Sequence, residues 1–204
     1  MIPIAFLIDT ISCDTAGTQK QLLETIRRLD RNAFQPHLIC LREADWMRRN
    51  KLPCPCSILN FKGFLKPTLP MVVQRLRRLV QKYRFQIIHT FFEDSIFVGY
   101  LGAMFCWPRP LLLSSRRDMG LGNANQPWYH KLYKLALPTV NKSFAGIVAN
   151  SAQIKAYVAK REKTPPSKIA VVYNGIDITS KAGPVPAVLQ THTADIWIAI
   201  TASL

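Results

Sequence analysis

Short apolar runs alternate with helix-patterned segments along most of the chain, and this alternation limits the fold more than any other feature of the sequence. Each expected strand is continuously apolar, as in residues 3–8, which is typical of strands buried on both faces. Each expected helix repeats apolar side chains every three or four residues, as residues 69–84 do. This pattern predicts an α/β fold: a doubly wound, parallel, Rossmann-like sheet with helices on both faces.

The expected elements fill the chain up to about residue 173. Strands are expected at residues 3–8, 36–41, 57–61, 86–90, 111–115, 145–149 and 168–173, and helices at residues 18–31, 69–84, 95–105, 128–142 and 151–161. Thr18 and Gln21 have the spacing of a capping box at the start of the first helix. Pro138 predicts a kink in the fourth helix.

The character of the sequence changes after Asp177. Residues 179–195 carry Gly183 and two prolines without apolar periodicity, which predicts a linker. Residues 196–204 are apolar again and predict one more strand. We therefore expect residues 1–178 to form one domain, and the last strand either to pair with the sheet of this domain or to begin a second domain that is missing from the chain.

Basic residues outnumber acidic ones by 27 to 12, which gives a net charge of +15. Residues 46–92 hold ten basic residues and no acidic one, so they form a patch rather than a salt-bridged surface. On the polar side of the helix at residues 69–84 we expect Arg75, Arg77, Arg78 and Lys82. We expect this side to face an anionic membrane surface, with a solvated outer face as the alternative. Nucleic acid is not expected, because no recognition helix or aromatic-interleaved basic motif is present.

The cysteines and apolar runs indicate the compartment. Cys54 and Cys56 lack a second pair, so we expect no metal site and reduced thiols. No basic region precedes the apolar residues 2–8, so we expect no signal peptide. Prolines interrupt the apolar run at residues 96–113, so we expect no membrane span there. These features predict a cytoplasmic protein, peripheral at the inner face of the cytoplasmic membrane.

Ligands of a doubly wound sheet bind beyond the carboxyl ends of its strands, so the loops at those ends hold the candidate site residues. The first such loop ends in Gly17 and Thr18, and amides at a helix start suit a phosphate. An ordinary strand-to-helix turn is the alternative. His89 ends a strand, which suits an acid, base or ligand role, although a single histidine is more often structural.

Two further loops carry polar side chains. The loop after the fifth expected strand holds Arg116, Arg117 and Asp118, and guanidinium groups suit a phosphate or a sugar carboxylate. A solvated arginine–aspartate pair is the alternative. Asn150 and Ser151 begin a helix, and an N-cap is a sufficient explanation for them.

Four pieces of the sequence occur in one order and spacing. They are the glycine turn after the first strand, Ile-Ile-His at residues 87–89, Ile-Val-Ala-Asn-Ser at 147–151, and Val-Val-Tyr-Asn-Gly-Ile-Asp at 171–177. This order resembles the amino-terminal domain of family 4 glycosyltransferases, retaining enzymes with two facing Rossmann-like domains (the GT-B architecture). The resemblance covers about residues 2–178. Ser-Ser-Arg-Arg-Asp at residues 114–118 is similar to the exopolysaccharide-type branch.

The resemblance implies roles for the loop residues. The amino-terminal domain would bind the acceptor, and a carboxy-terminal domain the nucleotide-sugar. By matched position, Gly17 would lie near the donor phosphates, His89 and Arg116 near the acceptor, Asn150 and Ser151 along the cleft, and Asn174, Gly175 and Asp177 at the interdomain hinge. Many relatives carry a histidine after the fifth strand, where this chain has two arginines.

The resemblance thus implies the acceptor-binding half of a retaining glycosyltransferase that acts on a lipid-linked or polysaccharide acceptor. No cofactor is expected beside the nucleotide-sugar donor, and no catalytic residue is assigned. We expect the chain to be inactive alone, and a separate chain could supply the donor half. The alternative is a non-catalytic basic membrane- or anion-binding module on the same fold. An epimerase of the same architecture is less favoured, because the Asn-Gly-Ile-Asp ending favours a transferase.

Overall fold

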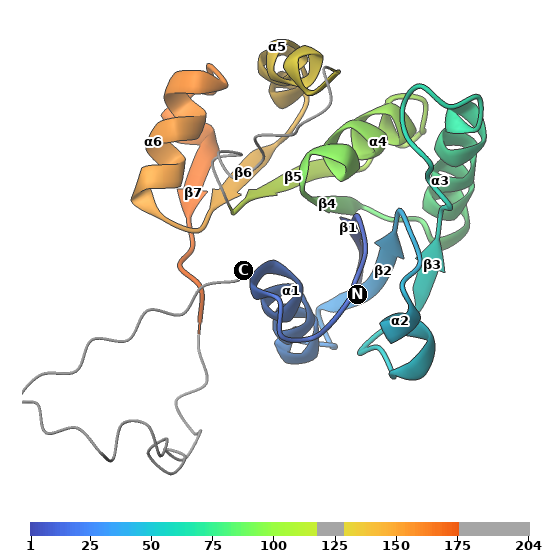
Figure 1. Cartoon of the computed structure of the whole chain (residues 1–204). Helices are drawn as coiled ribbons and strands as arrows, with labels where there is room; N and C mark the ends of the chain where they lie inside the picture. Colours follow the sequence, from blue (N-terminus) through green and yellow to red (C-terminus); the bar gives the residue numbers. More distant parts are fainter. Residues whose placement is uncertain (118–128, 176–204) are drawn as a thin grey trace, which may run out of the picture. The chain divides into compact units, whose positions relative to one another are not determined.

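The computed structural model describes residues 1–117 and 129–175. Within these residues, seven strands form one parallel sheet in the order β3-β2-β1-β4-β5-β6-β7 (Figure 1). The strands are β1 (Ile2–Ile8), β2 (Phe34–Cys40), β3 (Cys56–Ile58), β4 (Ile87–Phe91), β5 (Leu111–Arg116), β6 (Gly146–Ala149) and β7 (Ile169–Val171). The helices are α1 (Gly17–Arg28), α2 (Asp45–Arg49), α3 (Leu69–Tyr83), α4 (Glu93–Met104), α5 (Tyr129–Lys142) and α6 (Ala152–Arg161), with a 3-10 turn at Pro166–Lys168.

The expected doubly wound sheet is confirmed, and its two faces carry different helices. Phe6 and His89 are register partners and lie on the face that α1 covers, within an apolar cluster that includes Leu22 and Ile26. Ile88 and Leu112 point to the opposite face and pack with residues of α3, α4 and α5. Figure 1 shows α3, α4 and α5 along one side of the sheet and α1 on the other.

The central strand β1 and its neighbour β2 read as continuously apolar because both of their faces are covered. From Ala5 to Ile8, β1 is buried on both faces. A third apolar cluster joins β6 and β7 to α6 through Ile147, Ile154 and Ile169, whereas the other face of these two strands is only partly covered. Burial on both faces explains why alternation of polar and apolar residues is missing from β1.

Several local expectations change in the structure. The first helix begins at Gly17 with Ala16 as its N-cap residue, and no side chain caps it, so Thr18 and Gln21 form no capping box. Thr18 already lies inside the first turn, where its side chain is past the N-cap position. The short helix α2 was not expected. Pro138 does lie inside α5, as expected.

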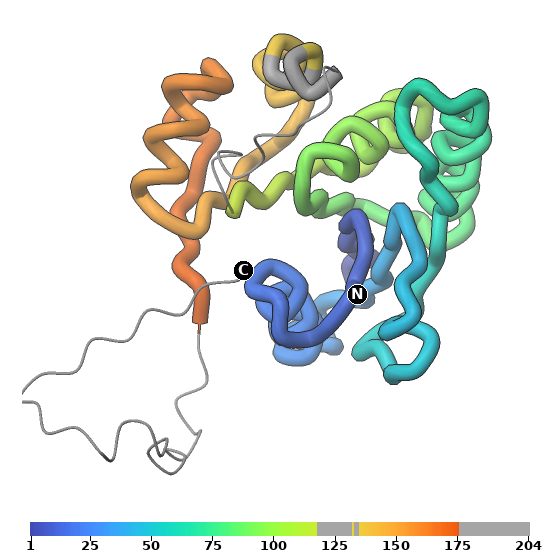
Figure 2. Tube along the Cα trace, in the orientation of Figure 1, coloured from blue at the N-terminus to red at the C-terminus, as the bar shows by residue number. Residues whose placement is uncertain are grey.

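The ends of the parallel strands define two opposite edges of the sheet. All strands run the same way, so their carboxyl ends meet at one edge, here called the carboxyl edge, and their amino ends meet at the amino edge. The path of the trace between the two edges can be followed in Figure 2. The first compact unit ends at Asn174. The expected linker at residues 179–195 and the expected strand at 196–204 lie outside the described residues.

Candidate functional site

The carboxyl edge has its topological switch point between β1 and β4. The chain moves outward from β1 to β2 and β3 on one side, and from β4 to β7 on the other. The loops after β1 and β4 therefore leave the sheet in opposite directions, and ligands of open α/β sheets bind in the crevice between such loops. Phe92, between β4 and α4, has a φ of 71°, a conformation that non-glycine residues adopt rarely and that concentrates at functional sites.

Three charged side chains meet at this switch point. The Arg42 guanidinium, which follows β2, lies 2.8 Å from the Asp94 carboxylate and 3.8 Å from that of Asp9. The Arg42 amide also donates to the carbonyl of Asp9 at 2.8 Å, which ties the ends of β1 and β2 together. Arg42 rests over the ring of Phe61, with 5.1 Å between the guanidinium carbon and the ring centroid. The cluster is therefore held in place from three elements.

The Asp9 carboxyl is suited to hydrogen bonding with a hydroxyl group. Burial and the neighbouring Asp94 charge raise the pKa of Asp9 to about 7, against a smaller opposing effect of Arg42. Asp9 Oδ1 and the adjacent Thr10 Oγ1 are buried, and neither has a hydrogen-bond partner among the described residues. Near neutral pH such a carboxyl can both donate and accept a hydrogen bond.

A second polar group lies farther along the same edge. The Arg117 guanidinium, just past β5, donates to the Asn174 side chain and lies 5.8 Å from the ring centroid of Phe91. The Asn150 side-chain amide donates to the carbonyl of Arg117 at 3.1 Å, while Asn150 Oδ1 is buried and unpaired within the described chain. The structure thus brings together three residues that the sequence proposed separately: Arg117, Asn150 and Asn174.

Arg116 lies away from this edge, and its expected contact with an anion is not what the structure shows. Its side chain is 8% exposed and pairs with Glu162 at 3.0 Å. It also donates to the side chains of Ser114 and Asn141. Side chains alternate along a strand, so Arg117 stays at the edge while Arg116 points into the interior beneath α5 and α6. The sequence could not show Glu162 as its partner, 46 residues away.

His89 also differs from its expected position. It lies in the middle of β4 rather than at its carboxyl end, with its ring stacked on Phe91 at 4.6 Å between centroids. Its Nε2 lies 2.9 Å from Ser115 Oγ. Burial, with a smaller effect of the Arg117 charge, lowers the pKa of His89 to about 4, so the ring is neutral. His89 is therefore a half-buried histidine packed within the sheet, below the edge.

The loop after β1 is closed partly by a side chain. The side-chain oxygen Oε1 of Gln19 accepts from the backbone amides of Ser12 and Cys13, at 2.8 and 3.1 Å. These two amides are therefore already hydrogen-bonded. The backbone amides at the uncapped start of α1, at Gly17 and Thr18, are the groups of this loop that could bind an anion. Ser151 is the N-cap of α6, as expected, and accepts from the Ile154 amide at 3.2 Å.

The basic side chains expected on α3 differ in their partners. Arg75 donates to the carbonyl of Leu59, and Arg77 to the carbonyl of Phe105. Lys82 lies 5.1 Å from the ring centroid of Tyr83. Arg75, Arg78 and Lys82 are exposed, whereas Arg77 is half-buried. The polar side of α3 is thus partly used to fasten neighbouring loops.

Sequence reasoning missed the residues at the switch point itself. Asp9 follows β1, Arg42 follows β2, and Asp94 lies in the first turn of α4. No local motif marks these three residues. The strand-end positions of Asp9 and Asp94 were the available signal. The expected site residue Asp118 and the expected hinge residue Asp177 lie outside the described residues, and Gly175 falls in the second compact unit.

The part of the chain that the structure describes shows neither a metal cluster nor a membrane-spanning helix. No group of three or more His, Cys, Asp or Glu side chains there could hold a metal ion. All five cysteines are free thiols. None of the helices that the structure describes has the length and apolar content needed to cross a bilayer.

Comparisons with known proteins agree with this architecture. A glycosyltransferase from Rickettsia africae matches with a TM-score of 0.65 and 18% identity, over 86% of this chain and 44% of its own. The lipopolysaccharide outer core galactosyltransferase WaaB matches with a TM-score of 0.64 and 13% identity, over 88% of this chain and 47% of its own. The sucrose-phosphate synthase of Thermosynechococcus elongatus matches with a TM-score of 0.63 and 13% identity, over 85% of this chain and 48% of its own.

These solved structures have the GT-B fold, and this chain spans a little under half their length. At such identities they show the fold alone. No curated protein matches the chain. The model of Glycosyltransferase Family 4 matches residues 15–180, which include the carboxyl-edge loops that hold Arg42, Asp94, Arg117 and Asn150. The chain belongs to glycosyltransferase family 4, and its fold is that of the amino-terminal half of a GT-B enzyme.

Proposed function

We propose that the chain forms the acceptor-side wall of a retaining glycosyltransferase that moves a sugar from a nucleotide-sugar to a lipid-linked or polysaccharide acceptor. The observation that carries the proposal is the Asp9–Arg42–Asp94 cluster at the switch point of the sheet. Sugar acceptors are rich in hydroxyl groups, and this cluster offers a carboxyl of raised pKa beside a fixed guanidinium. Family membership supports sugar transfer in general.

The two polar groups of the carboxyl edge would each bind a different part of the acceptor. The Asp9 and Thr10 oxygens would accept or donate to hydroxyls, because both are buried and unpaired within the described chain. Arg117, held by Asn174, would face the phosphate of a lipid-linked acceptor or a sugar carboxylate, since a guanidinium binds either through two hydrogen bonds. A galactosyltransferase of lipopolysaccharide outer core among the structural neighbours fits a glycan acceptor.

Acceptor binding is tested first, on the purified chain. Oligosaccharides with and without a phosphorylated isoprenyl tail are titrated while amide resonances are followed by NMR. We expect shifts at Asp9, Arg42 and Asp94 with either ligand, and at Arg117 with the phosphorylated ligand alone. Asp9→Asn should weaken binding, whereas Asp14→Asn, an exposed carboxylate in the same loop, should leave it unchanged. Equal affinity of the two variants contradicts the proposed acceptor site.

Transfer is tested separately, because orientation of donor and acceptor between two domains supplies much of the rate. Labelled nucleotide-sugars are supplied to the chain alone and to the chain mixed with the carboxy-terminal half of the Rickettsia africae relative. We expect transfer only in the mixture. Transfer by the chain alone would show that it holds a complete site.

A further inference from the structure

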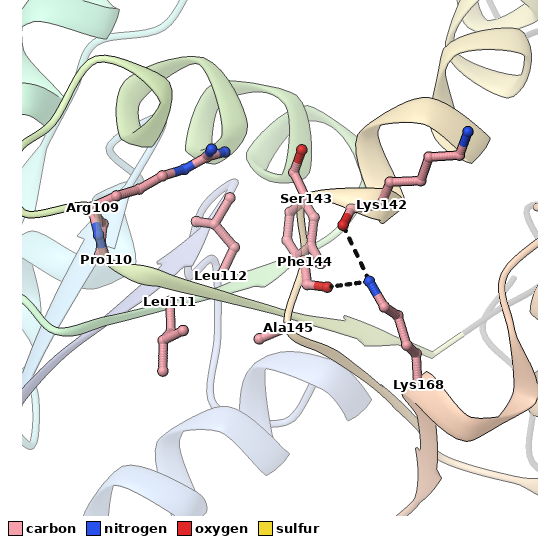
Figure 3. A pocket seen from close by; sticks show the side chains of 9 residues that line it. All are labelled: Arg109, Pro110, Leu111, Leu112, Lys142, Ser143, Phe144, Ala145 and Lys168. Atoms are coloured by element: carbon pink, nitrogen blue, oxygen red, sulfur yellow. Dashed lines mark hydrogen bonds between the residues drawn. The ribbon is translucent and has the colours of Figure 1, made fainter.

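The amino edge of the sheet, opposite the candidate site, holds a basic hollow that sugar transfer does not use. The hollow has a volume of about 330 Å³ and is lined by Arg109, Pro110, Leu111, Leu112, Lys142, Ser143, Phe144, Ala145 and Lys168 (Figure 3). Its volume is at the low end of the range for small-ligand sites, about 300–1,000 Å³. Three of the nine lining residues are basic and none is acidic.

The cations of this hollow differ from Arg42 at the switch point in having no carboxylate partner among the residues that the structure describes. The Lys168 ammonium donates to the carbonyls of Lys142 and Phe144, both at 3.1 Å, at the carboxyl end of α5. An ammonium has three protons to donate, so one remains for a ligand. Among the described residues, the exposed side chains of Arg109 and Lys142 have no acidic partner. In Figure 3 the Arg109 guanidinium extends toward the Ser143 hydroxyl.

Aromatic side chains project from the surface beside the hollow. Trp107 is 92% exposed and Phe105 is 60% exposed, and they lie two and four residues before Arg109 in the chain. Pro108 and Pro110 fix two backbone torsions of this segment, which limits its freedom. Arg77 of α3 donates to the carbonyl of Phe105 and lies 5.7 Å from its ring centroid, so a further cation joins the same surface.

We propose that this surface, named here the amino-edge patch (Phe105, Trp107, Arg109, Lys142 and Lys168), docks on an anionic phospholipid bilayer. The hollow would hold a lipid phosphate between Arg109 and Lys168, and Trp107 would enter the headgroup region, where tryptophan is favoured. Basic groups near an anionic leaflet each strengthen binding, and cations without carboxylate partners have their full charge available. This proposal names a different surface from α3 and does not depend on sugar transfer.

The choice of a bilayer over a protein or nucleic-acid partner follows from shape and charge. The aromatic side chains project rather than line a groove, so they suit insertion into a soft phase. No acidic residue occurs between Ser95 and Arg117, so no carboxylate in that segment repels the leaflet. Nucleic acid would need successive stacking aromatic groups along a basic track, and among the described side chains of this surface only Phe105 and Trp107 are exposed aromatic residues.

The test is co-sedimentation of the full chain with vesicles of phosphatidylcholine alone or with phosphatidylglycerol, at low and high salt. We expect salt-sensitive binding to the anionic vesicles only. R109E should lower the partition coefficient about 25-fold, because charge reversal changes two charge equivalents. R49E, an equal charge change on the exposed side of α2, should lower it about threefold at most.

Trp107 gives a second, optical reading of the same proposal. The fluorescence of the chain should shift to shorter wavelength on adding anionic vesicles, and W107A should remove this shift and weaken partitioning at least about tenfold. R78E tests the competing surface on α3 and should have an effect similar to that of R49E. Unchanged thermal melting of each variant shows that its fold is intact.

Four results would overturn the proposal. An equal loss of vesicle affinity in R49E and R109E would indicate general attraction between the charged chain and the vesicle. A larger loss in R78E than in R109E would assign the membrane to α3. Binding of glycerol phosphate without binding of vesicles would make the hollow a site for free phosphates. Binding of single-stranded RNA that R109E weakens, with no vesicle binding, would make the patch a nucleic-acid surface.

Discussion

The switch point at the carboxyl edge and the hollow at the amino edge carry charge in different ways. At the carboxyl edge, Arg42 lies between Asp9 and Asp94, and the positive charge is matched by neighbouring carboxylates. At the amino edge, Arg109 and Lys168 face a hollow without any acidic lining residue. A mixed cluster of fixed donors and acceptors suits a neutral, hydroxyl-rich ligand, whereas unmatched cations suit an anion. The positive charge of the chain is therefore unevenly distributed, and the switch point and the hollow suit different kinds of ligand.

The largest expected effect separates Arg116 from the carboxyl edge. Replacing Arg116 by Met leaves Glu162 buried without its partner, which should lower the free energy of unfolding by about 3–5 kcal/mol. Arg117→Met, one residue along the strand, should change it by less than about 1 kcal/mol, because Arg117 is bonded to an exposed side chain. Urea unfolding of both variants measures the difference. Equal losses would mean that both arginines serve the fold and that the edge has no separate site.

The second effect depends on pH and belongs to Asp9. Its pKa is raised from 3.8 to about 7, so between these values the unfolded chain is ionised there and the folded chain is not. The stability of the native chain should therefore fall as the pH rises from 4 to 7, by an amount on the order of 2–4 kcal/mol. In Asp9→Asn this loss should disappear, and the stability difference between variant and native chain should grow toward pH 7. Asp14→Asn is the control. A parallel pH dependence in Asp9→Asn and the native chain would contradict a buried, protonated Asp9.

The parallel sheet and its helices follow from the sequence because local patterns determine them. Continuous apolar strands and amphipathic helices such as α3 are visible within a few residues of chain, and right-handed crossovers then favour a doubly wound sheet. The switch-point cluster is different, because Arg42 and Asp94 are 52 residues apart and meet only through strand order. Arg116 and Arg117 show the same limit. They share one sequence motif, and only the alternation of side chains along β5 separates them.

The third effect concerns the helices whose ends form the amino edge. A Cβ atom at Gly102 of α4 would lie 2.4 Å from Leu76 Cδ2 and 2.8 Å from its Cγ, so α3 and α4 are in close contact there. Gly102→Ala should lower the free energy of unfolding by about 1–3 kcal/mol through overpacking. Gly17→Ala is a matched control, because nothing lies within 4 Å of its added Cβ and alanine favours the helix. The control should be neutral or slightly stabilising. Equal losses in both variants would refute close packing of α3 on α4.

The smallest expected effect is on the pKa of two histidines, His89 and His37, each of which has a cation nearby. The Arg117 charge contributes to the low pKa of His89, and the Lys82 charge contributes to the low pKa of His37, in each case after burial. Arg117→Gln should therefore raise the pKa of His89 and leave that of His37 unchanged, and Lys82→Gln should do the reverse. Both changes are measured by following the imidazole proton resonances through an NMR titration, and each variant serves as the control for the other. Because burial is the larger cause at both sites, each histidine should still titrate below pH 6.5 in the variants. A shift of both histidines in either variant would mean that the two cations act through the overall charge of the chain, and the contrast between separately charged regions would then fail.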